Sequence, residues 1–386
     1  MNSSRLRDGP KHTIRRWAFG QSCCGSSPIS GSAMPTSKTP AELAGSLHHR
    51  LVDFAWEQWS QMGVSGHTKR RDRWSIDPEA LLAFTLRVAR REPRLFDEVL
   101  DWMSLNLDVI SGQRLRNLAR DEETERLISA ALSWASSYST KVTRHRPPPS
   151  PEVEEPDHLF VRSTGAMQVR KPDPIFLGYG LVRPSLEPSH KSRPPVRSAP
   201  INFSFRLRDI FGVSARAEVV RALLLLHKAD ARAREIVLVA GYSRQNVNET
   251  LNALVSAGVV FVRRRGARDR SYSVDEEKWA SLLGIEIGEL PTFVEWPRLL
   301  EVCWRLVAWT ESLELEDRSD YMRASEARRF VADYEIDLQS LGLKLPDGRR
   351  FLGADYWVPF ERAVVDGLME ILEPASERGG AISEPT

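Results

Sequence analysis

The chain has 386 residues with 41% hydrophobic content, which is enough for two or three domains with their own cores. Three cysteines are too few for a disulfide framework, and no apolar run approaches the roughly 18 residues that a membrane-spanning helix requires. We therefore expect a cytoplasmic protein without membrane association. The net charge of +2 indicates no particular partner, so the distribution of charge along the chain is more informative.

Both ends of the chain have the composition of disordered segments. Residues 1–39 are basic and serine-rich and lack the hydrophobic stretch of a secretory signal, so we expect a disordered leader there. Met34 begins a more protein-like stretch and is a candidate for the natural start of the protein. Residues 374–386 are predicted to be a disordered tail.

Residues 40–138 are predicted to form an N-terminal helical domain of four or five helices. Apolar residues recur there at the helical period. Asp77 is a good N-cap, Pro78 suits the first helical position, and Pro93 marks the end of the helix that they begin. A break between two later helices is expected near Arg120.

Proline dominates the next stretch of the chain. Residues 147–200 contain 12 of the 24 prolines, which is too many for the interior of a packed domain. We therefore predict a Pro-rich linker over residues 139–204. The apolar segment PIFLGYGLVRP within it is a candidate for packing against a neighbouring domain.

The charge distribution distinguishes the middle of the chain from the rest. Residues 205–274 contain 13 Lys/Arg and 6 Asp/Glu, whereas residues 275–386 contain 12 Lys/Arg and 24 Asp/Glu. The local net charges are therefore +7 and −12. We expect a compact basic segment followed by an acidic C-terminal helical domain over residues 284–373.

The basic segment begins with a predicted series of three helices. The first has Ser214 as its candidate N-cap, the second starts near Asp230 and ends at Gly241, and Ser243 is the N-cap candidate of the third. The third helix has an apolar face and an opposite polar face. Its candidate DNA-binding residues, chosen because amides and guanidinium groups can bond base edges in a groove, are Arg244, Gln245, Asn246, Asn248 and Asn252.

A basic hairpin is predicted after the third helix. Gly258 ends the helix, and the segments VVFVRRR and RSYSV are plausible strands around the turn GARD. Asp269 is the only acidic residue among the arginines. Phosphates are the natural partners of such a cluster, because neutralising them releases counterions. The candidate DNA-binding residues of the hairpin are Arg263, Arg264, Arg265, Arg268 and Arg270.

The sequence REIVLVAGYSRQNVNETLNALVSAGVV, followed by RRRGARDRSYSVDEEKW, resembles the winged helix-turn-helix of bacterial regulators of the MarR and ArsR type. The resemblance covers about residues 207–279. It implies that SRQNVNETLNAL is a recognition helix and FVRRRGARDRSYSV a wing, within a DNA-binding domain over residues 205–283. It also implies minor-groove entry by Arg270 and a homodimer that binds a palindromic site.

The chain departs from that family in three respects. The resembling segment is embedded between two helical domains, and no Cys/His cluster corresponds to the metal sensor of many ArsR-type proteins. Glu249 lies on the polar face of the third helix, where it would repel phosphate unless it bonds a cytosine amino group.

We therefore expect a mainly α protein: a winged helix-turn-helix (three helices plus a β-hairpin wing) flanked by two helical domains, with a Pro-rich linker. The expected function is that of a sequence-specific regulator of transcription that binds double-stranded DNA. No catalytic motif, metal site or cofactor loop is found in the sequence, so an enzyme is not expected. The alternative is an adaptor or antitoxin-like protein whose helical domains bind a protein partner and whose winged helix docks that partner or autoregulates its operon.

Overall fold

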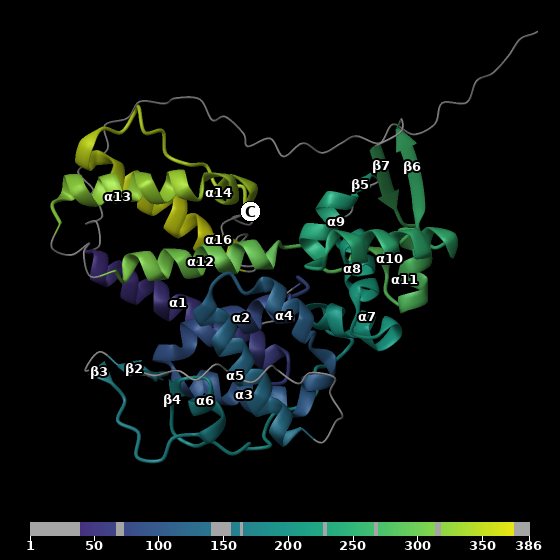
Figure 1. Cartoon of the computed structure of the whole chain (residues 1–386). Helices are drawn as coiled ribbons and strands as arrows, with labels where there is room; N and C mark the ends of the chain where they lie inside the picture. The colour runs from purple at the N-terminus through teal and green to yellow at the C-terminus, as the bar shows by residue number, and fades with distance from the viewer. Residues whose placement is uncertain are drawn as a thin grey trace, which may run out of the picture. The chain divides into compact units, whose positions relative to one another are not determined.

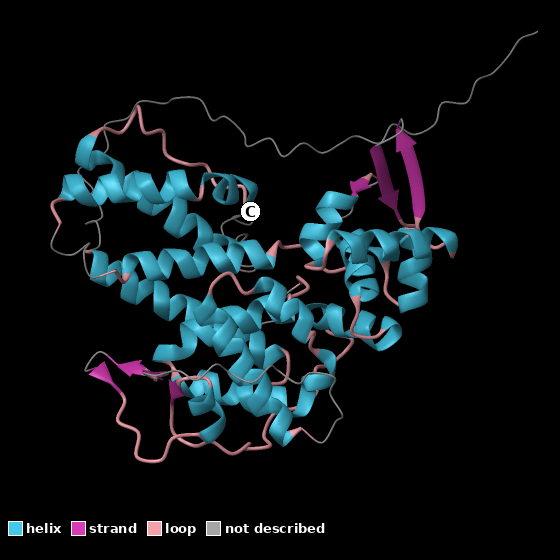
Figure 2. Cartoon of the chain, in the orientation of Figure 1, coloured by secondary structure: helices cyan, strands magenta, loops and turns pink. Residues whose placement is uncertain are grey.

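The computed structural model describes residues 39–66, 73–139, 156–162, 165–226, 230–265, 269–312 and 318–373. Within these ranges the protein is mainly helical, as the sequence predicts (Figure 2). The predicted leader (but for Thr39), the predicted tail, the turn residues 266–268 and therefore Arg268 lie outside the described residues.

The N-terminal helices pack around the second of them, α2 (Pro78–Val88). They are α1 (Pro40–Gln61), α2, α3 (Pro93–Asn106), α4 (Gly112–Leu118) and α5 (Glu122–Tyr138), with short 3-10 turns η1 (Ala89–Arg91) and η2 (Leu107–Val109). Every residue of α2 is buried. The prediction of Asp77 as N-cap is confirmed, because its carboxylate accepts a hydrogen bond from the Ala80 amide, 3.0 Å away. The predicted break at Arg120 lies between α4 and α5.

The C-terminal helices share a hydrophobic core with the N-terminal ones. They comprise α12 (Trp296–Thr310), α13 (Asp320–Asp333), α14 (Glu335–Ser340), α15 (Trp357–Phe360), the π-helical η7 (Glu361–Asp366) and α16 (Gly367–Leu372), with η4 (Ile287–Glu289) and η6 (Gly353–Tyr356). The ring of Trp296 stacks on Phe54 of α1 at 5.7 Å and meets the edge of Trp74 at 5.3 Å. Figure 1 shows α12 beside α1. The two helical regions expected to flank the middle of the chain as separate domains thus contribute to one core.

The described part of the Pro-rich stretch, residues 156–204, is packed rather than extended. It contains β1 (Asp157–His158) parallel to β4 (Leu181–Val182), β2 (Val161–Arg162) antiparallel to β3 (Gly165–Ala166), and α6 (Pro174–Gly178). Phe160 and Phe176 are buried in the core of the N-terminal helices. The buried guanidinium of Arg183 lies over both rings, at 5.3 and 5.0 Å, and pairs with Asp97 at 2.7 Å. This differs from the predicted linker because apolar side chains between the prolines bind the segment to that core.

Residues 203–283, here called the central module, have a hydrophobic core of their own. Its elements are α7 (Phe203–Phe211), α8 (Ala215–Leu225), β5 (Ala231–Arg232), α9 (Ala233–Ala240), α10 (Arg244–Ser256), β6 (Phe261–Arg265), β7 (Asp269–Ser273) and α11 (Glu276–Leu283). The three strands form an antiparallel sheet in the order β5-β7-β6 (Figure 1). Ser214 precedes α8 as expected, although its side chain makes no capping hydrogen bond. Strand β5 was not predicted from the sequence.

Candidate nucleic-acid interface

Helix α10 exposes its polar face because its apolar residues are held in the module core. Its buried residues are Val247, Leu251 and Leu254, in agreement with the predicted apolar face. Ser243 caps the helix by accepting a hydrogen bond from the Asn246 amide at 3.2 Å, as predicted. The predicted terminator Gly241 takes the left-handed conformation (φ 67°) that ends α9 and allows the turn into α10.

One row of α10 side chains lines an open concavity. Arg244, Asn248 and Asn252 are spaced four residues apart, so they share one side of the helix. The concavity has a volume of about 480 Å³ and is lined by Arg232, Ala233, Arg234, Arg244, Asn248, Asn252, Arg270 and Tyr272. Four arginines and two asparagines are thus gathered from α9, α10 and the sheet, and no acidic residue is among the lining residues.

The strand register explains why Arg270 belongs to this concavity. Strand β6 pairs with β7 so that Val262 lies opposite Tyr272 and Arg264 opposite Arg270. Tyr272 is 4% exposed and belongs to the module core. Because side chains alternate along a strand, Arg264 and Arg270 lie on the same face of the hairpin as Tyr272. That face is turned toward the core and α10.

The opposite face of the hairpin carries Arg263, which has an acidic partner that the sequence-based prediction overlooked. Its guanidinium lies 3.3 Å from the Asp230 carboxylate, and the Ser271 hydroxyl donates to the same carboxylate at 2.8 Å. Asp230 lies 33 positions before Arg263 in the sequence, so this pairing depends on the fold. Both charged groups are exposed, so a phosphate can compete for Arg263.

The structure thus brings together only part of the predicted set. Arg244, Asn248, Asn252 and Arg270 share the concavity. The predicted residues that do not line it are Gln245, Asn246, Arg263 and Arg264, all exposed. For Arg265 only the backbone is described, as the last residue of β6.

Four lining residues were missed by sequence reasoning: Arg232, Ala233, Arg234 and Tyr272. The two arginines flank the start of α9, where β5 pairs with β7 through Arg232 opposite Ser271. Two arginines at the start of the helix that precedes α10 are a signal that could have identified them. The position of Tyr272 depends on the sheet and has no such signal.

Two side chains in a second polar row of α10 bond to each other. The Gln245 amide donates to the Glu249 carboxylate at 2.9 Å, and both residues are exposed. This hydrogen bond occupies the Glu249 carboxylate and one N–H donor of the Gln245 amide. The row Arg244–Asn248–Asn252 is therefore the one best placed for an anionic ligand.

The turn between α9 and α10 is fixed by residues of α4. The Ser111 hydroxyl lies 2.9 Å from the Tyr242 hydroxyl, and the Asn117 amide donates to the Gly241 carbonyl at 3.1 Å. Arg114 donates through Nε to the Ala240 carbonyl at 2.8 Å. The start of α10, with Arg244 at its first position, is consequently held by the N-terminal helices.

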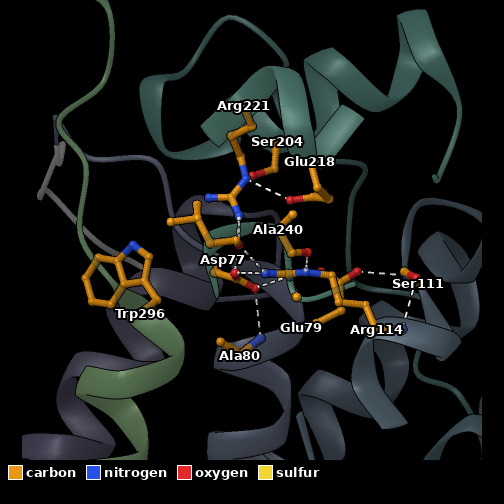
Figure 3. Close-up of polar contacts among 12 residues, drawn as sticks. Asp77, Glu79, Ala80, Ser111, Arg114, Ser204, Glu218, Arg221, Ala240 and Trp296 are labelled. Carbon is orange, nitrogen blue, oxygen red and sulfur yellow. Dashed lines mark hydrogen bonds and ion pairs between the residues drawn. The ribbon is translucent and has the colours of Figure 1, made fainter. Parts of the chain in front are cut away.

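Arg114 belongs to a buried network of six charged residues, here called the charge network. Its members are Asp77, Glu79, Arg114, Arg208, Glu218 and Arg221, all at most 6% exposed. Figure 3 shows the Arg114 guanidinium beside the Asp77 carboxylate, with Arg221 reaching the same carboxylate at 3.4 Å. Three positive and three negative groups balance one another, which is the condition for burying charges at tolerable cost.

The charge network keeps the carboxylates of Glu218 and Asp77 ionised. Burial alone would raise the pKa of the Glu218 carboxyl, but the charges of Arg208, Arg221 and Arg114 outweigh burial and hold that pKa far below its usual value of 4.5. The pKa of Asp77 is lowered in the same way, against burial, chiefly by Arg114. The network therefore joins α2 and α4 to the central module through buried ion pairs.

Neither a metal site nor a membrane-spanning helix is found among the described residues. No group of three or more His, Cys, Asp or Glu side chains among them is arranged to hold a metal ion. None of the helices in the described ranges is long and apolar enough to cross a membrane. The concavity holds guanidinium, amide and phenol groups, which suit the binding of phosphates and base edges.

Comparisons with known proteins identify no relative of this chain. Neither the scan against protein-family models nor the searches of curated proteins and of solved structures returned a match.

Proposed function

We propose that this protein is a sequence-specific DNA-binding regulator of transcription that acts through the central module. The observation that carries the proposal is the concavity in which Arg244, Asn248 and Asn252 of α10 meet Arg270 of the hairpin and Arg234 of α9. Phosphates and base edges are the ligands that such donors recognise in combination.

The order of elements supports the same proposal. A helix, a short turn, a second helix and an antiparallel hairpin follow one another from α9 to β7, as in the winged helix-turn-helix that the sequence resembles. In this proposal α10 is the recognition helix and β6–β7 the wing. A homodimer on a palindromic site is part of the proposal by analogy with that family.

In the proposed mechanism the two kinds of side chain have different tasks. Arg234 and Arg270, together with the exposed Arg263 and Arg264, neutralise phosphates and so supply affinity that depends on salt. Arg244, Asn248 and Asn252 contact base edges in the major groove and supply sequence discrimination. The charge network holds the end of α9, because Arg114 donates to the Ala240 carbonyl, and so supports the turn that leads into α10.

The test begins with selection of binding sites from random duplexes by the full-length protein. Affinity for the selected site is then measured at several salt concentrations for the wild type and for Arg270→Ala. Loss of one phosphate contact is expected to reduce the slope of log K against log salt by about 0.9. Arg349→Ala, an exposed arginine of the C-terminal region, is the matched control. Failure to enrich any sequence, or an unchanged slope in Arg270→Ala, would refute the proposal.

Binding of a protein partner is the second candidate, and one observation favours it. Tyr321 at the start of α13 is 65% exposed, and Leu352 beside η6 is 69% exposed. A Cβ built at Gly353, the residue after Leu352, would lie 3.7 Å from the Tyr321 ring, so the two exposed side chains belong to one region of the surface outside the central module. A stoichiometric partner that co-purifies from the native host and is lost in Tyr321→Ser, with DNA binding intact, would support this function.

A further inference from the structure

A second cavity lies on a different part of the central module, at its junction with the helical core. It has a volume of about 550 Å³. Its walls come from the chain before α2, the segment before α7, α7 itself, and the connection from α11 to α12. Cavities of this volume commonly hold small organic ligands. The lining does not overlap that of the concavity proposed to bind DNA.

Three arginines line this cavity, and their partners differ. Arg197 is neutralised by Asp209, to which it donates two hydrogen bonds of 2.6 and 3.2 Å. Arg206 donates to the carbonyl of Leu283, which fixes the guanidinium but leaves its charge unbalanced. Within the described residues no ion pair is formed by Arg73.

Arg73 nevertheless has a fixed backbone. Its carbonyl accepts a hydrogen bond from the Thr292 amide at 2.9 Å, and Trp74 forms a β-bridge with the same residue. Glu289 is the one acidic residue of the lining. Arg73 and Arg206 thus contribute to the lining from two different segments, and no acid of the described ranges pairs with either, a combination that favours an anion with more than one charged oxygen.

Part of the remaining wall is apolar. It includes Phe203, which is 2% exposed, together with Ile285, Leu290 and Pro291. A fully hydrated inorganic ion would leave this wall unused, whereas an organic anion would bury part of its apolar body against it.

We propose that this cavity is a binding site for a small organic anion. The ligand carries at least two charged oxygens, as a phosphate monoester or a dicarboxylate, and an apolar body. Its charged group lies between Arg73 and Arg206, and its apolar body lies toward Phe203 and Leu290. This proposal does not depend on DNA binding, because the titration that tests it contains no DNA and no residue lines both the cavity and the concavity.

The test uses calorimetric titration of the full-length protein with three probes at constant ionic strength. Phenyl phosphate has a dianionic phosphate on a ring, phthalate has two carboxylates on a ring, and inorganic phosphate has no apolar body. We expect phenyl phosphate or phthalate to bind saturably and at least tenfold more tightly than inorganic phosphate. The ring-bearing probe that binds better identifies the charged group.

Three variants assign that binding to the cavity. Arg73→Gln removes an exposed charge, and tenfold or greater weakening is expected. Gly288→Phe tests the site sterically without altering charge, because a Cβ at Gly288 meets no atom within 4 Å and the ring can occupy the cavity. Arg349→Gln, remote from the lining, is the control and should bind like the wild type.

Several outcomes would overturn the proposal. These are the absence of saturable binding of both ring-bearing probes, unchanged affinity in both cavity variants, or equal weakening in Arg349→Gln. A fourth is that Arg73→Gln weakens duplex DNA binding as strongly as Arg270→Ala while no probe binds, since Arg73 would then serve the DNA interface. Urea unfolding of each variant ensures that only folded protein is compared.

Discussion

Arg208 of α7 and Glu79 of α2 form a two-point ion pair in which both terminal guanidinium nitrogens lie 2.7 Å from a carboxylate oxygen. The two residues are 129 positions apart in the chain and both are buried. Arg208 also binds Glu218 of α8 at 2.6 Å. One guanidinium thus connects the N-terminal helices to the first two helices of the central module.

Arg208→Met should destabilise the protein strongly. Methionine is apolar and of similar length, but Glu79 and Glu218 would both lose a buried partner, and breaking a buried pair on one side costs about 3–5 kcal/mol. The free energy of unfolding in urea measures the effect. Arg329→Met, which removes an exposed partner of Glu326, is the control and should change stability by no more than about 1 kcal/mol. Equal effects of the two substitutions would contradict the importance of the charge network.

Acid should weaken the protein through the same network. The pKa of Glu218 is lower in the folded than in the unfolded chain, so its ion pairs stabilise the fold above about pH 4.5 and lose that contribution as pH falls toward the folded pKa. Glu218→Gln removes the titrating group. The stability difference between wild type and Glu218→Gln should therefore be largest at pH 7 and shrink steadily between pH 5 and pH 3, as measured by urea unfolding. A difference that is constant over this range would show that Glu218 has no lowered pKa.

Two glycines with similar backbones should respond differently to alanine. Gly241 and Gly258 both have positive φ, at 67° and 71°, so either substitution incurs about 1–2 kcal/mol of backbone strain. A Cβ at Gly241 would also lie 2.9 Å from Nε of the buried Arg114, whereas one at Gly258 meets nothing within 4 Å. Gly241→Ala should therefore lower the midpoint of urea unfolding further than Gly258→Ala. The reverse order would argue against the placement of Arg114 under the turn.

The two polar rows of α10 should contribute unequally to DNA recognition. Asn252→Ala should reduce discrimination between the selected site and a single-base variant by about 1–3 kcal/mol, because Asn252 lines the concavity. Gln245→Ala should have a smaller effect, because its amide already bonds Glu249. Competition binding with the two duplexes measures both. A larger loss of discrimination for Gln245→Ala would indicate that the row containing Gln245 contacts the bases instead.

Cys303 should be chemically inert in the folded protein. Burial raises the pKa of its thiol to about 12, because the side chain points from α12 into the hydrophobic core and is fully buried. In a Cys23→Ser, Cys24→Ser background, a thiol reagent such as DTNB should label no sulfur at pH 8 until denaturant is added, and then one. Rapid labelling of the native protein would show that α12 opens readily.

The predictable parts of the structure are those governed by local sequence. The helix over residues 244–256, its buried residues and its Ser243 cap follow from periodicity and capping chemistry. Strand β5 could not be found in this way, because its two residues become a strand only by pairing with β7 some forty positions later. Asp77 was identifiable as an N-cap, but nothing in its neighbourhood indicates that its carboxylate also binds Arg114 and Arg221.

The candidate site shows the same division. The amides and arginines of α10 and the hairpin were identifiable by type, because each belongs to a polar face or a basic cluster. Which of them converge was not, since that depends on strand register and on the turn at Gly241. The shared core of the N- and C-terminal helices was likewise hidden, because the Phe54–Trp296 contact joins positions too distant for periodicity to relate.

The buried ion pairs also determine whether the central module can be isolated as a fragment. A fragment consisting of residues 203–283 would retain Arg208, Glu218 and Arg221 but would lack Asp77, Glu79 and Arg114, so an unbalanced positive charge would face solvent where a helical neighbour had been. The proposed DNA-binding unit of this chain should therefore not be stable as an isolated fragment, and grafting it onto another protein would require Asp77 and Glu79 to be included.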